Sequence, residues 1–219
     1  MNKPVQTIRD EPRWPPALAI LAVLLLFALL PHHVHVLPIW LSWVAAIAVL
    51  VPMAAVALTT ANPRWLRIER TMIILLALAY VANTIVELAD MIGVITFHPR
   101  ETRAISLLSS SVAIWVSNVL VFSLLYWQID RGGPSARASK SSATPDWVFP
   151  QPASPEDLPP DWRPFFFDYL FLGYNTATAF SPTDALPLTR RAKMLMMIES
   201  AISLLTIVIV ASRAVGVLP

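Results

Sequence analysis

Residues 70–97 read RTMIILLALAYVANTIVELADMIGVITF, a long apolar run in which Glu87 and Asp90 are the only carboxylates. A helix needs roughly 20 predominantly apolar residues to cross a bilayer, and this run exceeds that length. The whole chain of 219 residues is 56% hydrophobic and only 14% charged. A soluble domain of this size could not bury that much apolar surface, so the sequence predicts an integral membrane protein in contact with the lipid bilayer.

Four further apolar stretches predict an all-α, polytopic fold. With the first run they make about five transmembrane helices, at 15–31, 38–59, 70–97, 104–127 and 193–217. The chain then divides into an N-terminal tail (1–14), a transmembrane helical hairpin (15–59), a second helical pair (70–127), a Pro/Ser-rich loop (128–163) and a C-terminal module (164–219). The first run ends at Pro31 without a small-x-small cleavage site, so we expect a retained helix and not a signal peptide.

Basic residues predict the orientation of these helices. Once the five spans are drawn, thirteen of the sixteen Lys and Arg residues fall on one side, and Arg100, Arg103 and Arg213 fall on the other. By the positive-inside rule the N-terminus and the long loop are cytoplasmic, and the C-terminus is outside.

The run at 70–97 carries Asn83, Glu87 and Asp90 at positions i, i+4 and i+7, which places them on one helical face. A carboxylate deep in a bilayer is costly, so this face must meet partners, water or a proton. One interpretation is an ion or proton path through Glu87 and Asp90. The other is packing against polar side chains of 104–127 and an ion pair for Asp90, with Ser110, Ser117, Asn118, Arg100 and Arg103 as the available partners.

The aromatic residues of the Pro/Ser-rich loop and Glu199 of the last helix each have a structural or a functional interpretation. Trp147, Phe149 and Trp162 interrupt the Pro/Ser-rich loop, so either the loop is pinned to the protein or the headgroup layer, or these rings dock a partner. In the last helix, Glu199 lies about two turns from a basic start, where we expect Arg190, Arg191 or Lys193 to neutralise it.

Residues 164–174 read PFFFDYLFLGY, which is too short to span a membrane and too apolar to stay in water. We expect a short interfacial or re-entrant helix here. Hydroxyl side chains follow it at Thr176, Thr178, Ser181 and Thr183 and could coordinate a cation where the helix ends, and Asp184 completes the segment. At membrane depth, irregular backbone is tolerated only against protein or water, so a re-entrant placement implies a cavity. The alternative is an amphiphilic elbow with a capped turn at 181–184.

The stretch TATAFSPTDALPLT, residues 176–189, resembles the filter region of tetrameric potassium channels, in which a short pore helix, a filter and an inner helix follow one another. Thr178 matches the filter threonine, Asp184 the aspartate after the filter and Pro187 the proline beyond it. Phe180 and Pro182 stand where that family has glycines, whose backbone freedom lets carbonyls point at the ion. The resemblance therefore implies a pore loop with a filter that does not select potassium.

A second resemblance rests on DRGGP (130–134), PDWVFPQ (145–151), FDYL (167–170) and TAFSPTD (178–184). Together these segments look like a group of small multipass bacterial membrane proteins without an established activity, which implies the bacterial inner membrane.

Several classes of function lack a signature in this sequence. It contains no nucleophile elbow, zinc-protease helix motif or phosphate-binding glycine loop, and no basic face for nucleic acid, so we expect neither an enzyme nor a nucleic-acid partner. We expect no cofactor and no metal site. Two hypotheses remain. One is a homo-oligomeric cation channel of pore-loop type for monovalent cations, and the other is a membrane scaffold or accessory subunit that binds a partner through the 128–163 loop.

Overall fold

The computed structural model describes residues 11–29, 39–59, 62–97, 104–138, 144–150, 162–178 and 185–217. Helices account for most of these residues. The elements in chain order are α1 (Trp14–Leu29), α2 (Ile39–Leu58), α3 (Pro63–Phe97), α4 (Ala104–Ile129), the 3-10 turn η2 (Asp130–Gly132), α5 (Pro134–Ala138), β1 (Trp147–Val148), α6 (Phe166–Thr178), β2 (Leu186–Pro187) and α7 (Arg190–Val217).

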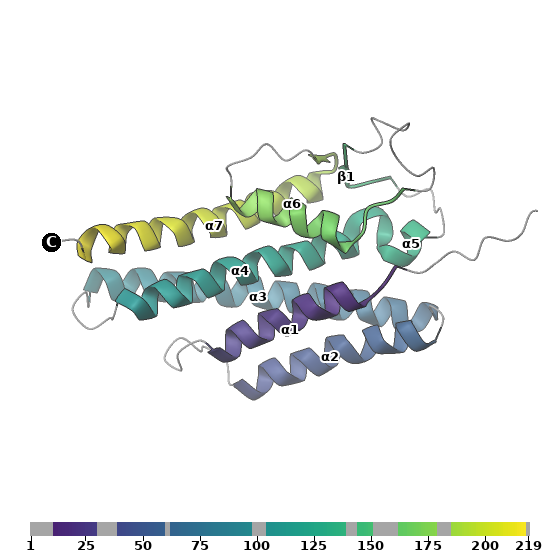
Figure 1. Cartoon of the computed structure of the whole chain (residues 1–219), viewed down its shortest axis with the longest axis horizontal. Coiled ribbons are helices and arrows are strands. Elements are labelled where there is room, and N and C mark those ends of the chain that lie inside the picture. Colours follow the sequence, from purple (N-terminus) through teal and green to yellow (C-terminus); the bar gives the residue numbers. More distant parts are fainter. Residues whose placement is uncertain are drawn as a thin grey trace, which may run out of the picture.

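The helices form an elongated bundle with α4 at its centre (Figure 1). Helix α4 packs against α1, α3, α6 and α7, while α2 packs against α3 and α1. The core includes Ile20, Met53, Ile73, Phe122 and Leu172, which come from five different helices and are almost fully buried. Because such side chains interlock along the bundle, α4 is the element that holds the other helices in place.

The predicted helix at 70–97 begins earlier than its hydrophobic pattern indicates. Helix α3 starts at Pro63, and the Asn62 side-chain Oδ1 accepts a hydrogen bond of 3.0 Å from the Arg64 backbone N–H. Asparagine is a favoured N-cap, and proline suits the first helical position because the N–H it lacks would have no partner there. Arg64, Arg67 and Arg70 therefore lie on the first turns of a 35-residue helix and not in a loop.

Three helices within the described residues are long and apolar enough to cross a membrane: Pro63–Gly93, Leu108–Gly132 and Arg190–Ala211. The described parts of the first two predicted spans form shorter apolar helices, Trp14–Leu26 and Trp43–Leu58. Helix α1 has 16 residues, which is about 24 Å and shorter than a typical hydrocarbon core of about 30 Å. The helical fold is confirmed, while five crossings stay a prediction.

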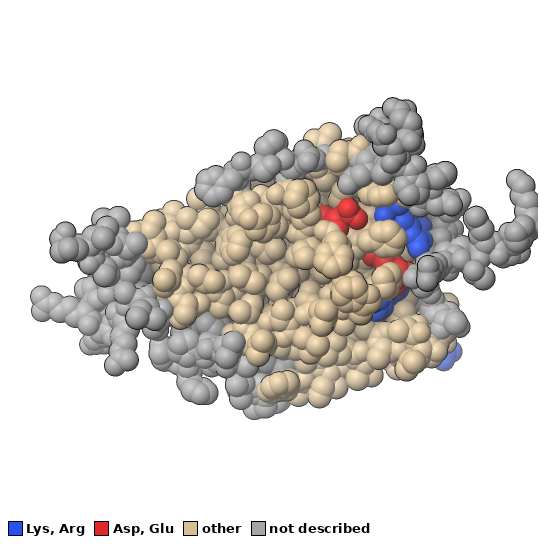
Figure 2. All heavy atoms as spheres, viewed as in Figure 1, with Lys and Arg blue, Asp and Glu red and all other residues tan. Residues whose placement is uncertain are grey.

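Charged side chains are concentrated at one end of the bundle. On the face shown in Figure 2, acidic and basic residues gather near α5, and the long middle of the bundle carries neither. We call this the charged end and define it by Glu11, Arg13, Glu69, Asp130, Arg137, Asp146 and Arg191. Hydrogen bonds and ion pairs among these residues link the segment before α1 to α3, η2, α5, the residue before β1 and the start of α7. The side of the membrane on which this end lies stays a prediction from the basic residues.

The Pro/Ser-rich loop, expected to be mostly irregular, holds ordered elements in its described parts. After α4 the backbone turns through Arg131, Gly132 and Gly133, all with positive φ, and α5 follows. A Cβ at Gly133 would lie 3.1 Å from the Gln128 carbonyl oxygen, so the turn requires glycine there. Strand β1 then pairs antiparallel with β2, with Trp147 opposite Pro187, and ties this loop to the start of α7.

Candidate functional site

Helix α6 is a half-helix that runs along α4 and α7 from the charged end toward the middle of the bundle (Figure 1). Its start lies by the end of α4, where the Phe166 and Trp127 rings are 6.1 Å apart. Its last turns lie by Trp115, whose ring is 6.0 Å from that of Tyr174. The order of these contacts makes α6 antiparallel to α4, and Figure 1 shows that α6 runs in the same direction as α7.

The sequence at the start of α6 explains why the helix begins there. The Asp168 carboxylate accepts a hydrogen bond of 2.7 Å from the Phe165 backbone N–H. A carboxylate at this third position satisfies an N–H that has no partner within the helix, as in a capping box. Partial burial raises the pKa of Asp168, so this cap combines a hydrogen bond with some cost of removing the carboxylate from water.

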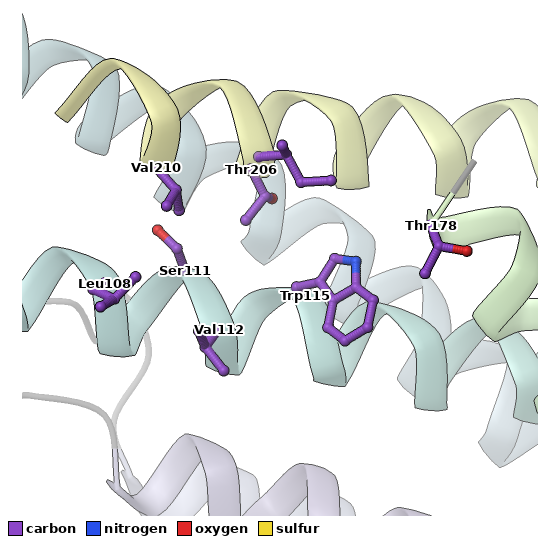
Figure 3. A pocket seen from close by; sticks show the side chains of 8 residues that line it. Leu108, Ser111, Val112, Trp115, Thr178, Thr206 and Val210 are labelled. Carbon is purple, nitrogen blue, oxygen red and sulfur yellow. The ribbon is translucent and has the colours of Figure 1, made fainter. Parts of the chain in front are cut away.

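The far end of α6 lies deep along the bundle. Thr178 borders an apolar groove of about 220 Å³ together with Trp115 of α4 and Thr206 of α7 (Figure 3). The remaining lining residues are Leu108, Ser111, Val112, Ile207 and Val210. The Ser200 hydroxyl donates a 3.2 Å hydrogen bond to the Thr176 carbonyl, and Ser200 is roughly 15 Å along α7 from its first residue, as expected for 1.5 Å per residue. The next described residue, Ala185, precedes β2 and the start of α7, so the chain enters and returns at the same end of the bundle.

The half-helix ends one turn later than predicted and begins two residues later. It was expected at 164–174 but spans Phe166–Thr178, which places Thr176 and Thr178 inside the helix and not in the turn after it. Thr176 donates a 2.8 Å hydrogen bond to the Leu172 carbonyl, and Thr178 donates to the Tyr174 carbonyl at 3.0 Å. Both hydroxyls are thus engaged with the helix itself. Ser181, Thr183 and Asp184 lie outside the described residues.

A second group of polar side chains lies between α4, α6 and α7, in the part of the bundle beyond the charged end. Glu199 of α7 is 0% exposed, and its Oε2 accepts a hydrogen bond of 2.5 Å from the Tyr126 hydroxyl. The Asn118 amide donates to the Glu199 backbone carbonyl at 3.0 Å and to the Ser203 hydroxyl at 2.9 Å. We call Asn118, Tyr126, Glu199 and Ser203 the Glu199 cluster.

The expectation that Glu199 would be neutralised by Arg190, Arg191 or Lys193 is wrong. The Glu199 carboxyl points across to α4, and Arg191 donates instead to Asp146 from the charged end. The sequence signal for this cluster was Glu199, Ser203 and Thr206 at helical spacing i, i+4 and i+7, a polar stripe on one face of an otherwise apolar helix. Its partner stripe on α4, Asn118 and Tyr126, could be paired with it only once the packing was known.

The polar face predicted on α3 is present in part. The Asn83 amide donates a hydrogen bond of 2.7 Å to Glu87, which is 3% exposed. Asp90 is exposed on the bundle surface, and the arginines considered as its partners lie outside the described residues. Asn118, one of the partners considered for this face, bonds to α7 instead. Among the described residues, no hydrogen bond of Asn83 or Glu87 reaches α6.

At the charged end, each buried carboxylate has donors. Asp130 accepts from the Tyr169 hydroxyl at 2.6 Å and from the Asp146 backbone N–H at 2.8 Å. Burial is the main cause that holds the pKa of Tyr169 well above its usual range, so its hydroxyl keeps the proton that it donates. Glu11 pairs with Arg137 at 3.1 Å and accepts a 2.6 Å bond from the Trp127 indole. This dense pairing fixes the starts of α6 and α7 against the end of α4.

The aromatic residues proposed to dock a partner pack against the chain itself. Trp147 is 0% exposed, its ring is 4.8 Å from that of Tyr126, and its indole nitrogen lies 3.3 Å from the Met196 sulfur. Phe149 is almost fully buried between Tyr169 and Trp162, with ring separations of 5.4 and 6.3 Å. The structure therefore corrects the docking hypothesis for Trp147 and Phe149, and Trp162 is half-buried beside them.

No family model, curated protein or solved structure matches this chain. The resemblances to potassium-channel pore loops and to small multipass bacterial proteins therefore stay predictions from the sequence.

Proposed function

We propose that this chain is a multipass protein of the cell's inner membrane, with five crossings, that forms a homo-oligomeric, cation-permeable channel of pore-loop type. Helix α6, residues 179–185 and α7 make up its re-entrant module. The module enters from the same end as most of the basic residues, which the positive-inside rule assigns to the cytoplasm.

The observation that carries this proposal is the position at which α6 ends. Thirteen residues are too few to cross a bilayer, and near the end of α6 the Thr176 carbonyl accepts a 3.2 Å hydrogen bond from Ser200, which lies ten residues after the start of α7. A helix C-terminus carries partial negative charge from its last carbonyl groups, and at low dielectric this charge favours cations over anions. A half-helix whose C-terminal end points into the membrane is thus suited to stabilise a cation there.

The bundle itself supports a pore between copies. The large side chains of the described residues fill the interior around α4, and the groove at the tip of α6 is apolar. The outer faces of α6 and α7 carry exposed apolar side chains, including Phe167, Phe171, Met197 and Leu204. In this proposal those faces meet lipid or the next protomer, and the C-terminal ends of α6 from several protomers converge on one axis.

We propose that Thr178, Ser181, Thr183 and Asp184 line the pore, with Thr176 next to them in sequence. The polar face of α3, formed by Asn83, Glu87 and Asp90, is proposed as a further part of the ion path. Phe180 and Pro182 restrict the backbone where a potassium filter needs glycine. We therefore expect little discrimination between potassium and sodium.

The test is cation flux into liposomes that contain the purified protein, with potassium and sodium measured separately and the assembly state determined in the same detergent. Asp184→Asn removes the proposed charge at the mouth and should lower flux several-fold while leaving the oligomer intact. Asp157→Asn makes the same chemical change in the 128–163 loop and should leave flux unchanged. The proposal is wrong if the assembled wild-type protein conducts neither potassium nor sodium. It is also wrong if Asp184→Asn leaves the flux unchanged.

A further inference from the structure

Glu199 differs from the buried carboxylates of the charged end. Glu11, Glu69 and Asp146 each pair with an arginine, and Asp130 accepts two hydrogen bonds. Glu199 is 0% exposed, yet no described cation lies within ion-pair distance of it. Its Oε2 accepts from Tyr126, and its Oε1 has no hydrogen-bond partner among the described residues.

An ionised carboxylate in this position would be very unfavourable. Removing such a charge from water costs several kcal/mol even after the surroundings relax, and a single hydroxyl donor does not offset that cost. The free-energy cost of burying a neutral carboxylic acid is far smaller, because the acid carries no net charge. The geometry thus selects the protonated form.

We propose that Glu199 is a proton-binding site inside the bundle, which holds its proton at neutral pH while α6 is packed against α4 and α7. This ligand is a proton and not a metal or an organic molecule, and the site exists whether or not cations pass through the proposed pore.

Helix α6 closes this site with Gly173. A Cβ at that position would lie 3.3 Å from Glu199 Oε1, 3.2 Å from the Val119 carbonyl oxygen and 2.5 Å from the Ser123 hydroxyl. The absence of a side chain lets the α6 backbone approach the carboxyl closely and exclude water. Release of the proton therefore requires α6 to move away at Gly173, so that water or a cation reaches Oε1.

The other titratable groups around Glu199 do not supply a counter-charge. Tyr126 of α4 is neutral and serves as a donor, and Arg191 at the start of α7 is held by Asp146. Glu87 of α3 bonds to Asn83, and Asp168 and Tyr169 of α6 bond near the charged end. Lys193, six residues before Glu199, forms none of the ion pairs found among the described residues.

Infrared spectroscopy of the full-length protein in liposomes at neutral pH tests this inference without reference to flux. The wild type should show the C=O stretch of a protonated carboxyl, and Glu199→Gln should remove that band or the part of it due to Glu199. Tyr126→Phe keeps the acid but removes its hydrogen bond, so it should shift the band and not abolish it. This second variant keeps the test decisive if Glu199→Gln does not fold.

Glu87→Gln is the matched control, because it replaces another buried carboxyl on a different helix. The band assigned to Glu199 should persist in it. If the protonated-carboxyl region is the same in wild type and Glu199→Gln, or does not respond to Tyr126→Phe, Glu199 is ionised and the inference is overturned. The infrared measurement does not depend on ion flux. If no flux were detected, the channel proposal would be rejected, and the assignment of a protonated Glu199 would be unaffected.

Discussion

The Arg191 guanidinium donates two hydrogen bonds, each 2.6 Å long, to the two carboxylate oxygens of Asp146. Asp146 is 0% exposed and directly precedes β1, whereas Arg191 lies in the first turn of α7 and remains partly exposed. The Asp146 carbonyl also accepts a 2.8 Å bond from the Leu188 N–H. These bonds hold the segment before β1 against the start of α7, although the two are more than 40 residues apart in sequence.

Asp146→Asn should destabilise the protein by about 2 kcal/mol, because an amide cannot accept both guanidinium bonds and a buried donor or acceptor is left unsatisfied. The loss stays below that of a fully buried ion pair since Arg191 can turn to water. Thermal unfolding in detergent measures it. Arg190→Gln alters the exposed neighbouring arginine and should have almost no effect. Equal unfolding temperatures for the two variants would contradict this role of Asp146.

Trp147→Ala should cost about 3–5 kcal/mol, as for other fully buried aromatic side chains, because it leaves a cavity beside Tyr126 and Met196. Val148→Ala, one residue later on the exposed side of β1, should cost well under 1 kcal/mol. Limited proteolysis and thermal unfolding of both variants provide the comparison. If Trp147→Ala left stability intact and released a bound partner, the ring would be a docking residue after all.

The sequence predicted the helical content well because long apolar runs have few alternatives to helices. It misplaced the start of α3, since Arg64 and Arg67 look like loop residues until Asn62 and Pro63 are recognised as a helix start. It also left open whether Trp147 packs inward, because burial of a ring in a proline-rich loop depends on a strand pairing between residues 147 and 187. Local pattern carries no information on such a distant contact.

Gly173→Ala should destabilise the packing of α6 by about 1–3 kcal/mol, because its Cβ would lie 2.5 Å from the Ser123 hydroxyl and α6 must shift. Gly93→Ala is the matched control on α3, where a Cβ meets no atom within 4 Å. Alanine is the better helix former, so that control should be neutral or slightly stabilising. Denaturant or thermal unfolding of the two variants measures the difference.

The same clash can be isolated by a double-mutant cycle. Ser123→Ala removes the hydroxyl that the new methyl group would meet, so Gly173→Ala should cost clearly less in that background than in the wild type. Additive effects of the two changes would show that α6 does not approach α4 at this point.

Tyr169→Phe should cost about 1–3 kcal/mol, because the fully buried Asp130 would lose the hydroxyl that donates to its Oδ2. Tyr174→Phe makes the same change on the same helix at a side chain that is 49% exposed, and it should be nearly neutral. Unfolding temperatures in one detergent compare them. A Tyr169→Phe protein as stable as the Tyr174→Phe protein would show that the bond to Asp130 contributes nothing.

The candidate site illustrates a similar limit of the sequence. Its residues after Thr178 were proposed from a local resemblance, and the structure adds the depth at which α6 ends, which no local pattern contains. Glu199 was visible as a carboxyl in an apolar helix, but its basic neighbours in sequence suggested ion pairing. The structure shows that Tyr126 of α4 is the hydrogen-bond partner of Glu199. Arg191 instead forms its ion pair with Asp146.

The proposed re-entrant module requires Thr178 to lie inside the membrane, and spin labelling measures that depth directly. The chain contains no cysteine, so single cysteines can be placed at Phe165, Thr178 and Leu188 without further changes. Each label's relaxation by oxygen, which concentrates in the hydrocarbon core, is compared with its relaxation by a water-soluble nickel complex. The account predicts labels at 165 and 188 near the membrane surface and the label at 178 well inside. Equal, shallow depths for all three would contradict it.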